Sequence, residues 1–297
     1  MGVLLLVLLA CGPGVGLATA RLTGARSPAA VPFPASAVLP QRVVRHTSAW
    51  RRAGFLAGLA AGGVAAFSGA LGRGLLLAAP VFALCIVAGV VVGEASVRSP
   101  GGRARLAAVE VRRARDYLPR RLAPAVIAAM ALLLALLTVT TATGAADDLG
   151  RSGRVVVLQC STALQQSAGP WPGSYYSLPL VIAVTAGLIA GAAALRSVVR
   201  RPRAGADAEA VAADEVLRRR AGQAITSACG ILIAVPLAGC CLVTARALLS
   251  LSCGPACLTF VAWAILALVP ASVVLISWCT ALLLTPDRGF PRLLPGT

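Results

Sequence analysis

The sequence contains no lysine, no asparagine and a single histidine, and only 12% of its 297 residues are charged. A soluble domain typically has about twice that charged fraction. The composition is 58% hydrophobic with a mean hydropathy of +0.86, and it includes several uncharged runs of 18 residues or more. These properties exclude an ordinary soluble domain and indicate that lipid surrounds most of the chain.

Familiar catalytic patterns are also missing. The single histidine, His46, has no second histidine or acidic residue near it in the sequence, which argues against a zinc site. The patterns H-E-x-x-H, G-x-S-x-G and G-x-x-x-x-G-K-[ST] do not occur. No acidic residue or arginine falls near the middle of an apolar run, which argues against a proton-coupled transporter and an intramembrane aspartyl protease. We therefore assign no catalytic, metal-binding or cofactor-binding residue.

Arginine supplies all 27 basic residues, and the formal net charge is +17. Such a charge on a soluble surface would suggest nucleic acid. Here the arginines lie in short blocks beside apolar runs, and no nucleic-acid-binding motif accompanies them. Polytopic membrane proteins mark their cytoplasmic side in this way. We expect these blocks to contact anionic lipid at the cytoplasmic face and, as an open alternative, another membrane or cytoplasmic protein, but no nucleic acid.

The apolar runs predict an all-α, polytopic transmembrane helix bundle that forms one integral membrane domain over residues 1–297. With seven spans, the N-terminus outside and the C-terminus inside, 23 arginines lie in cytoplasmic segments and four lie outside. Inverting the topology would reverse that ratio, against the positive-inside rule. The predicted spans are 3–20, 53–71, 74–93, 122–143, 177–195, 221–245 and 258–284, and the predicted basic cytoplasmic loops are 21–52, 94–121 and 196–220.

The first apolar run, Val3 to Ala20, has two interpretations. Its last residues, Ala18-Thr19-Ala20, form the A-x-A pattern of a signal-peptide cleavage site. However, no positive charge precedes the run, and cleavage would export the arginine-rich segment that follows. We therefore expect an uncleaved first helix.

An internal repeat relates residues 92–131 to residues 190–229. A shift of 98 residues aligns the two segments without a gap and gives 13 identities in 40 positions, where chance in this biased composition would give about four. Each unit is predicted as helix, basic segment, helix, and both enter the membrane in the same sense, as in the parallel repeats of some transporters. Duplication and the convergence of two arginine-rich loops are the alternative interpretations.

Each repeat unit places an aspartate four residues before an arginine, at Asp116–Arg120 and Asp214–Arg218. Such residues are neighbours on a helix. Pro119 interrupts the first pair, and we expect both pairs to lie in solvated loops. If these loops bind a partner, the candidate residues are Arg103, Arg105, Asp116, Arg120, Arg201, Arg203, Asp214 and Arg218.

Glycines recur at a spacing of four residues in three of the predicted spans. Small residues four apart allow helix backbones to approach closely in lipid. We expect these glycines to pack helices within the bundle; homodimerisation through the second helix is the alternative. The residues are Gly54, Gly58, Gly62, Gly89, Gly93, Gly187 and Gly191.

Three of the nine cysteines, Cys160, Cys253 and Cys257, fall in predicted outside loops, where disulfides can persist. We expect one bridge between Cys160 and either Cys253 or Cys257. A C-x3-C redox pair formed by Cys253 and Cys257 is the alternative. The cysteines within the spans are interpreted as packing residues.

Two basic stretches resemble loop segments of uncharacterised multi-pass membrane proteins of actinobacteria. The first runs from residue 93 to residue 120 and ends in VEVRRARDYLPR; the second comprises RRPRAG at 200–205 and VAADE at 211–215. The resemblance implies a multi-pass protein of the bacterial plasma membrane, and it carries over no functional residue.

These observations favour a non-enzymatic accessory or interaction component of that membrane. The alternative is a permease-like transporter built on the repeated helix–loop–helix unit, and a membrane enzyme without a recognisable motif is third. A polar cavity where the two repeat units meet would favour the transporter, because parallel repeats place substrate sites near the middle of the bilayer. A dry, closely packed interface there would favour the accessory protein.

Overall fold

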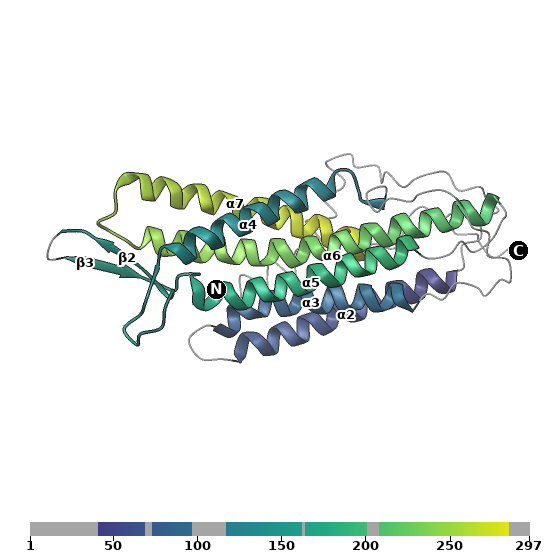
Figure 1. Ribbon diagram of the computed structural model, residues 1–297, viewed down its shortest axis with the longest axis horizontal. Coiled ribbons are helices and arrows are strands. Elements are labelled where there is room, and N and C mark those ends of the chain that lie inside the picture. The colour runs from purple at the N-terminus through teal and green to yellow at the C-terminus, as the bar shows by residue number, and fades with distance from the viewer. Residues whose placement is uncertain (1–40, 69–72, 97–116, 162–163, 201–207, 285–297) are drawn as a thin grey trace, which may run out of the picture.

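The computed structural model describes residues 41–68, 73–96, 117–161, 164–200 and 208–284. These residues form six long helices, which lie side by side along the long axis of the molecule, and a small sheet at one end (Figure 1). The helices are α2 (Gln41–Phe67), α3 (Arg73–Ala95), α4 (Leu122–Ala142), α5 (Ser174–Arg200), α6 (Ala208–Leu249) and α7 (Ala256–Leu284). The strands β1 (Gly144–Ala145), β2 (Val155–Gln159) and β3 (Gln165–Ala168) pair antiparallel in the order β1-β2-β3.

Helix α6 is the centre of the bundle. Its 42 residues correspond to about 63 Å of helix at 1.5 Å per residue, about twice the thickness of the hydrocarbon core of a bilayer. Helices α3, α4, α5 and α7 all pack against it. As a result, three consecutive side chains that point in different directions around the helix are all buried: Ile231, Leu232 and Ile233. Most of the core therefore consists of contacts that the other helices make with this one.

Helices α3 to α7 are long and apolar enough to cross a membrane. Large apolar side chains also cover outward-facing parts of the bundle, among them Ile127 on α4, Ile189 on α5 and Phe260 on α7. Exposure of such a surface to water is unfavourable, whereas lipid solvates it. The fold is thus a mostly helical bundle with five candidate membrane spans.

Seven spans were predicted, and the difference has two sources. The predicted span 3–20 lies outside the described residues. The predicted span 53–71 overlaps α2, which ends at Phe67, and the apolar part of this helix, residues 53–67, is only 15 residues long. About 20 residues are needed to cross the hydrocarbon core, so α2 does not count as a span by length and composition.

Three predicted loops contain regular structure. Residues 41–52 of the predicted loop 21–52 are helical and form the start of α2. In the predicted loop 196–220, α5 continues to Arg200 and α6 already begins at Ala208. Arginine-rich sequence was interpreted as loop, but two of its guanidinium groups, those of Arg51 and Arg218, have partners on neighbouring helices. The segment between α4 and α5, predicted as a loop in an all-α protein, contains the three-stranded sheet.

The bundle has two chemically different ends. Consecutive helices run in opposite directions, so one end of the bundle holds the beginnings of α2, α4 and α6 and the last residues of α3, α5 and α7. We call this the basic end. The sheet and the α6–α7 connection lie at the other end, here called the disulfide end (Figure 1). Arg73, Arg151, Arg154 and Arg246, the four arginines predicted outside, all belong to the disulfide end. Among the described residues, the arginines are therefore segregated between the two ends as the sequence predicted, whereas the orientation in a membrane stays a prediction.

The glycines predicted at a spacing of four residues on α2 and α3 lie where the backbones of these two helices touch. A Cβ atom at Gly54 of α2 would come within 2.8 Å of the carbonyl oxygen of Cys85 on α3, and one at Gly89 of α3 would come within 2.7 Å of the Cα atom of Gly54. The glycine face of α2 is thus occupied by α3 and is not exposed to a second copy. Gly58, Gly62 and Gly93 lie in the same α2–α3 interface, and Gly187 and Gly191 of α5 lie against Leu232 and Cys229 of α6.

The substitution Gly89→Ala tests this close packing. It should lower the free energy of unfolding by about 1–3 kcal/mol, because two backbones must separate to admit the methyl group. Gly63→Ala on α2 is the matched control, since a Cβ atom there meets nothing within 4 Å; it should be neutral or raise stability by up to about 1 kcal/mol through helix propensity. Unfolding of both variants in mixed detergent micelles measures the difference, and equal stability would contradict the α2–α3 interface.

Candidate functional site

The basic end holds ion pairs that are withdrawn from solvent. The Nη2 atom of Arg51 on α2 lies 2.9 Å from Oε1 of Glu94 on α3, and the two side chains are only 16% and 7% exposed. A pair this far from water is screened little by salt. It therefore fixes the first half of α2 against the end of α3.

A second buried pair lies inside α6. Arg218 is 2% exposed; its Nε and Nη2 atoms each lie 2.8 Å from Oδ2 of Asp214, one helical turn earlier. Its Nη1 atom donates to the carbonyl oxygens of Val198 and Val199, at 2.6 and 3.1 Å. These carbonyls belong to the last turn of α5, where no backbone N–H group of the same helix remains to donate to them. Arg218 thus ties α6 to the C-terminal end of α5, where a cation is also favoured by the helix dipole.

The prediction that Asp214 and Arg218 lie in a solvated loop is therefore wrong. The sequence spacing was consistent with a helical pair, but the second partner, the end of α5, is distant in the sequence and gave no local signal. Arg120, which matches Arg218 in the repeat, is exposed and precedes α4 in a turn. The candidate loop residues Arg103, Arg105, Asp116, Arg201 and Arg203 lie outside the described residues.

The two repeat units differ locally where the structure describes both. Residues 117–121 form turns that end before α4, whereas the matching residues 215–219 are part of continuous helix. Pro119 accounts for the difference, because a proline interior to a helix removes a hydrogen bond and clashes with the preceding turn; Leu217 stands in its place in α6. The Tyr117 hydroxyl donates to Glu215, the residue 98 positions later, at 3.2 Å. Equivalent positions of the two units therefore touch, and duplication stays a prediction.

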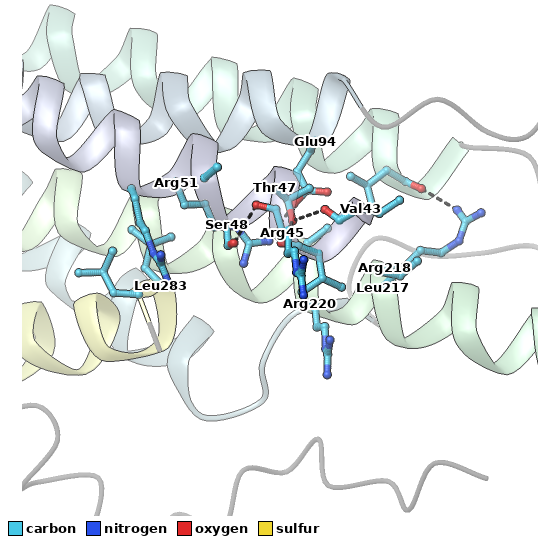
Figure 2. Close-up of a pocket in the computed structure, with 16 residues that line it drawn as sticks. Val43, Arg45, Thr47, Ser48, Arg51, Glu94, Leu217, Arg218, Arg220 and Leu283 are labelled. Atoms are coloured by element: carbon cyan, nitrogen blue, oxygen red, sulfur yellow. Dashed lines mark hydrogen bonds and ion pairs between the residues drawn. The ribbon is translucent and has the colours of Figure 1, made fainter. Parts of the chain in front are cut away.

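A cavity of about 330 Å³ opens at the basic end between α2 and the ends of the helices beside it (Figure 2). We call it the basic cavity. Its charged lining comes from three helices, as the labelled side chains of Figure 2 show. The charged residues are Arg45, Arg51 and Arg52 of α2, Glu94 of α3, and Arg218 and Arg220 of α6.

Sequence reasoning did not select the arginines of α2 as site residues. Arg45 and Arg52 are seven residues apart, which places them on one face of a helix. That spacing was an available signal, but it has meaning only once residues 41–52 are recognised as helical. Their cavity neighbours on α3, α6 and α7 could not be inferred from the spacing.

The disulfide end is held to the bundle by a covalent link. Cys160, after β2, and Cys253, in the α6–α7 connection, form a disulfide with their Cα atoms 5.7 Å apart, and Cys257 is a free, exposed thiol. Cys253 and Cys257 were the two predicted partners of Cys160, and the structure pairs it with Cys253. The side chain of Gln166 on β3 reinforces the link, because it donates to the Ser252 hydroxyl and accepts from the backbone of Ser252 and Cys253.

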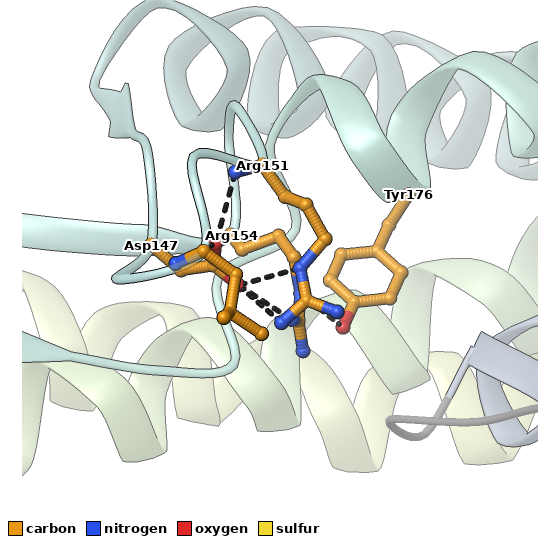
Figure 3. A network of polar contacts seen from close by, with 5 residues as sticks. Asp147, Arg151, Arg154 and Tyr176 are labelled. Carbon is orange, nitrogen blue, oxygen red and sulfur yellow. Dashed lines mark hydrogen bonds and ion pairs between the residues drawn. The ribbon is translucent and has the colours of Figure 1, made fainter.

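A polar network fixes the loop between β1 and β2 (Figure 3). Asp147 pairs with Arg151 at 2.8 Å and with Arg154 at 2.6 Å, and Arg154 also donates to the hydroxyl of Tyr176 at the start of α5. Desolvation acts to raise the pKa of Asp147, but hydrogen bonds from the side chain and backbone of Arg151 and from the backbone of Leu149 lower it from 3.8 to about 2. The network is satisfied by its own members, and its role is to position the loop.

The part of the chain that the structure describes contains no candidate metal centre. No group of three or more His, Cys, Asp or Glu side chains there could hold a metal ion. The Nε2 atom of His46 lies 2.9 Å from the Ser96 hydroxyl and accepts from the Trp50 indole at 3.1 Å. This histidine therefore joins α2 to the end of α3.

Comparison with known proteins identifies no relative: no family model, no curated protein and no solved structure matches the chain.

The buried Arg218 contact can be tested against its exposed neighbour. Arg218→Gln should lower the free energy of unfolding by about 3–5 kcal/mol, because it leaves Asp214 buried without its cation. Arg219→Gln is the control: Arg219 pairs with Glu215 at 3.0 Å, but these side chains are 56% and 40% exposed, and such pairs contribute about 0–1 kcal/mol. Thermal unfolding in detergent measures both, and similar losses would contradict the role given to Arg218.

The disulfide is tested by counting reactive thiols at this end of the purified, non-reduced protein. A polar maleimide should modify Cys257 but neither Cys160 nor Cys253, and Cys160→Ser should add Cys253 to the modified sites. Peptide mass spectrometry locates the modification. Labelling of Cys160 in the native protein without reductant would exclude the bridge.

Proposed function

We propose that this chain is a non-enzymatic, multi-pass membrane protein that acts as an accessory or interaction component, with its basic end on the cytoplasmic side of a bacterial plasma membrane. The distribution of arginine supports this orientation, because positively charged segments are retained on that side. The exposed arginines of the basic end include Arg45, Arg52, Arg120 and Arg200. Together they form a surface that attracts acidic headgroups or an acidic partner.

The observation that carries the proposal is the packing at mid-depth. Around Ile231, Leu232 and Ile233 of α6 the neighbouring side chains are apolar and the central helix is enclosed. Among the described residues, arginine and acidic side chains occur in the connections, near helix ends, in the first half of α2 and in the first third of α6. Hydroxyls also occur inside the bundle: that of Thr226 donates to the Gly222 carbonyl, whereas those of Ser227 and Ser277 are buried without a hydrogen-bond partner among the described residues.

The permease-like alternative requires a polar, water-accessible site where the two repeat units meet. The helices that carry the first unit, α3 and α4, both contact α5 and α6, which carry the second. There a Cβ atom at Gly187 would overlap the side chain of Leu232 and come within 3.0 Å of Leu84. The side chains are closely packed at this point, which favours the accessory protein. A membrane enzyme is third, since no reactive constellation supports it in the described part of the chain.

The native cysteines provide the test. Cys240, Cys241 and Cys279 are buried in α6 and α7, whereas Cys257 is exposed at the disulfide end. In native membranes, a membrane-impermeant maleimide should label Cys257 from outside the cell and leave the three buried thiols unmodified from either side. Site-resolved mass spectrometry of intact cells and of inverted vesicles measures this. Labelling of Cys240, Cys241 or Cys279 from either side would support the transporter instead, and labelling of Cys257 only in inverted vesicles would reverse the orientation.

A further inference from the structure

The basic cavity has more positive charge in its walls than the protein neutralises. Five arginines and one glutamate line it. Glu94 is engaged with Arg51, and Asp214, outside the lining, is engaged with Arg218. Arg45 and Arg52 have no carboxylate partner among the described residues. Cations gathered around a cavity repel one another, and an anion inside it would relieve that repulsion.

Hydrogen-bond donors in the lining are also left over. The Nε atom of Arg51 is buried and has no hydrogen-bond partner among the described residues. The hydroxyls of Thr47 and Ser48 donate instead to carbonyl oxygens of their own helix, at 3.1 and 2.9 Å. The donors that face a ligand are therefore guanidinium groups. Their planar N–H groups match the oxygens of phosphate better than any other side chain does.

The position of the cavity indicates where the ligand comes from. Leu283 and Leu284, at the end of α7, and Val43 and Val44 of α2 form its apolar lining. Leu284 is the last residue of a candidate span, so the cavity lies at the depth where acyl chains meet headgroups. Helix α2 packs mainly on α3 and makes few contacts with α7, so in the proposed orientation the cavity would open towards the bilayer between these two helices.

We propose that the basic cavity binds the phosphate group of an anionic ligand, and that the headgroup of an anionic phospholipid is its source. Basic pockets between helices at the cytoplasmic face bind such headgroups through arginine. The inference rests on the proposed orientation, which puts the basic end at the leaflet rich in anionic lipid. It deepens the proposed function, because it turns a general attraction for acidic surfaces into one defined site. A soluble phosphate ester offers the same chemistry and is distinguished by experiment.

The test uses the full chain in neutral detergent and measures binding of dioctanoyl phosphatidylglycerol by native mass spectrometry and by the thermal shift. Dioctanoyl phosphatidylcholine serves as the zwitterionic comparison, and glycerol 3-phosphate as the soluble phosphate. The variant Arg45→Gln/Arg52→Gln removes two exposed arginines of the cavity. The control Arg120→Gln/Arg121→Gln removes two exposed arginines of the same end that do not line it.

Phosphatidylglycerol should bind the wild-type chain and the Arg120/Arg121 variant with similar affinity. The Arg45/Arg52 variant should bind about 10- to 30-fold more weakly, since each basic residue close to an anionic headgroup contributes to its binding. Glycerol 3-phosphate binding as tightly as the lipid would keep the phosphate site and overturn the lipid as its source. Two results would overturn the site while leaving the proposed function intact. One is that the Arg45/Arg52 and Arg120/Arg121 variants lose affinity for phosphatidylglycerol equally, and the other is that phosphatidylcholine binds the wild-type chain as tightly as phosphatidylglycerol does. The proposed function fails separately, through labelling of the buried thiols.

Discussion

Close approach of helix backbones is the constraint on which the rest of this structure depends. Lipid tails are as apolar as the side chains of the bundle, so burial from water does not drive helices together within a bilayer. Van der Waals contact has to do so, and it increases as backbones come closer. Gly54 and Gly89 allow this between α2 and α3, whereas Gly187 and Gly191 of α5 make room for the side chains of Leu232 and Cys229 on α6. A helix as polar as α2 is held in the bundle by this contact.

The second constraint is that arginines close to lipid must be satisfied or remain at the surface. Arg51 and Arg218 are drawn inward, and each has a carboxylate, with the α5 carbonyls as additional acceptors for Arg218. Removing guanidinium groups from water is costly unless their N–H groups find acceptors. The basic end therefore combines two kinds of arginine. Some are structural and paired with acids, while others, such as Arg45 and Arg52, remain available around the cavity.

The sequence predicted those elements whose signal is local. Helices α4 and α7 begin and end within two residues of the predicted spans, because a long uncharged run between polar segments is sufficient to define them. The start of α2 and the early start of α6 were missed, since both depend on partners distant in the chain, such as Glu94 for Arg51 and Val198 for Arg218. Strand β2, with the β-branched run Val155–Val157, carried a readable signal. Strand β3 did not, because its sequence, QQSA, has little strand preference and is fixed by its register with β2.

The link between Cys160 and Cys253 closes a covalent ring. The two residues are 93 positions apart, and the segment between them contains β3, α5 and all of α6. The central helix and its neighbour α5 are thus joined twice, once through the chain between them and once through the bridge. A single cut in the backbone between α5 and α6 would leave one molecule rather than two fragments. The two halves of this hairpin could then separate only if the bridge were reduced as well.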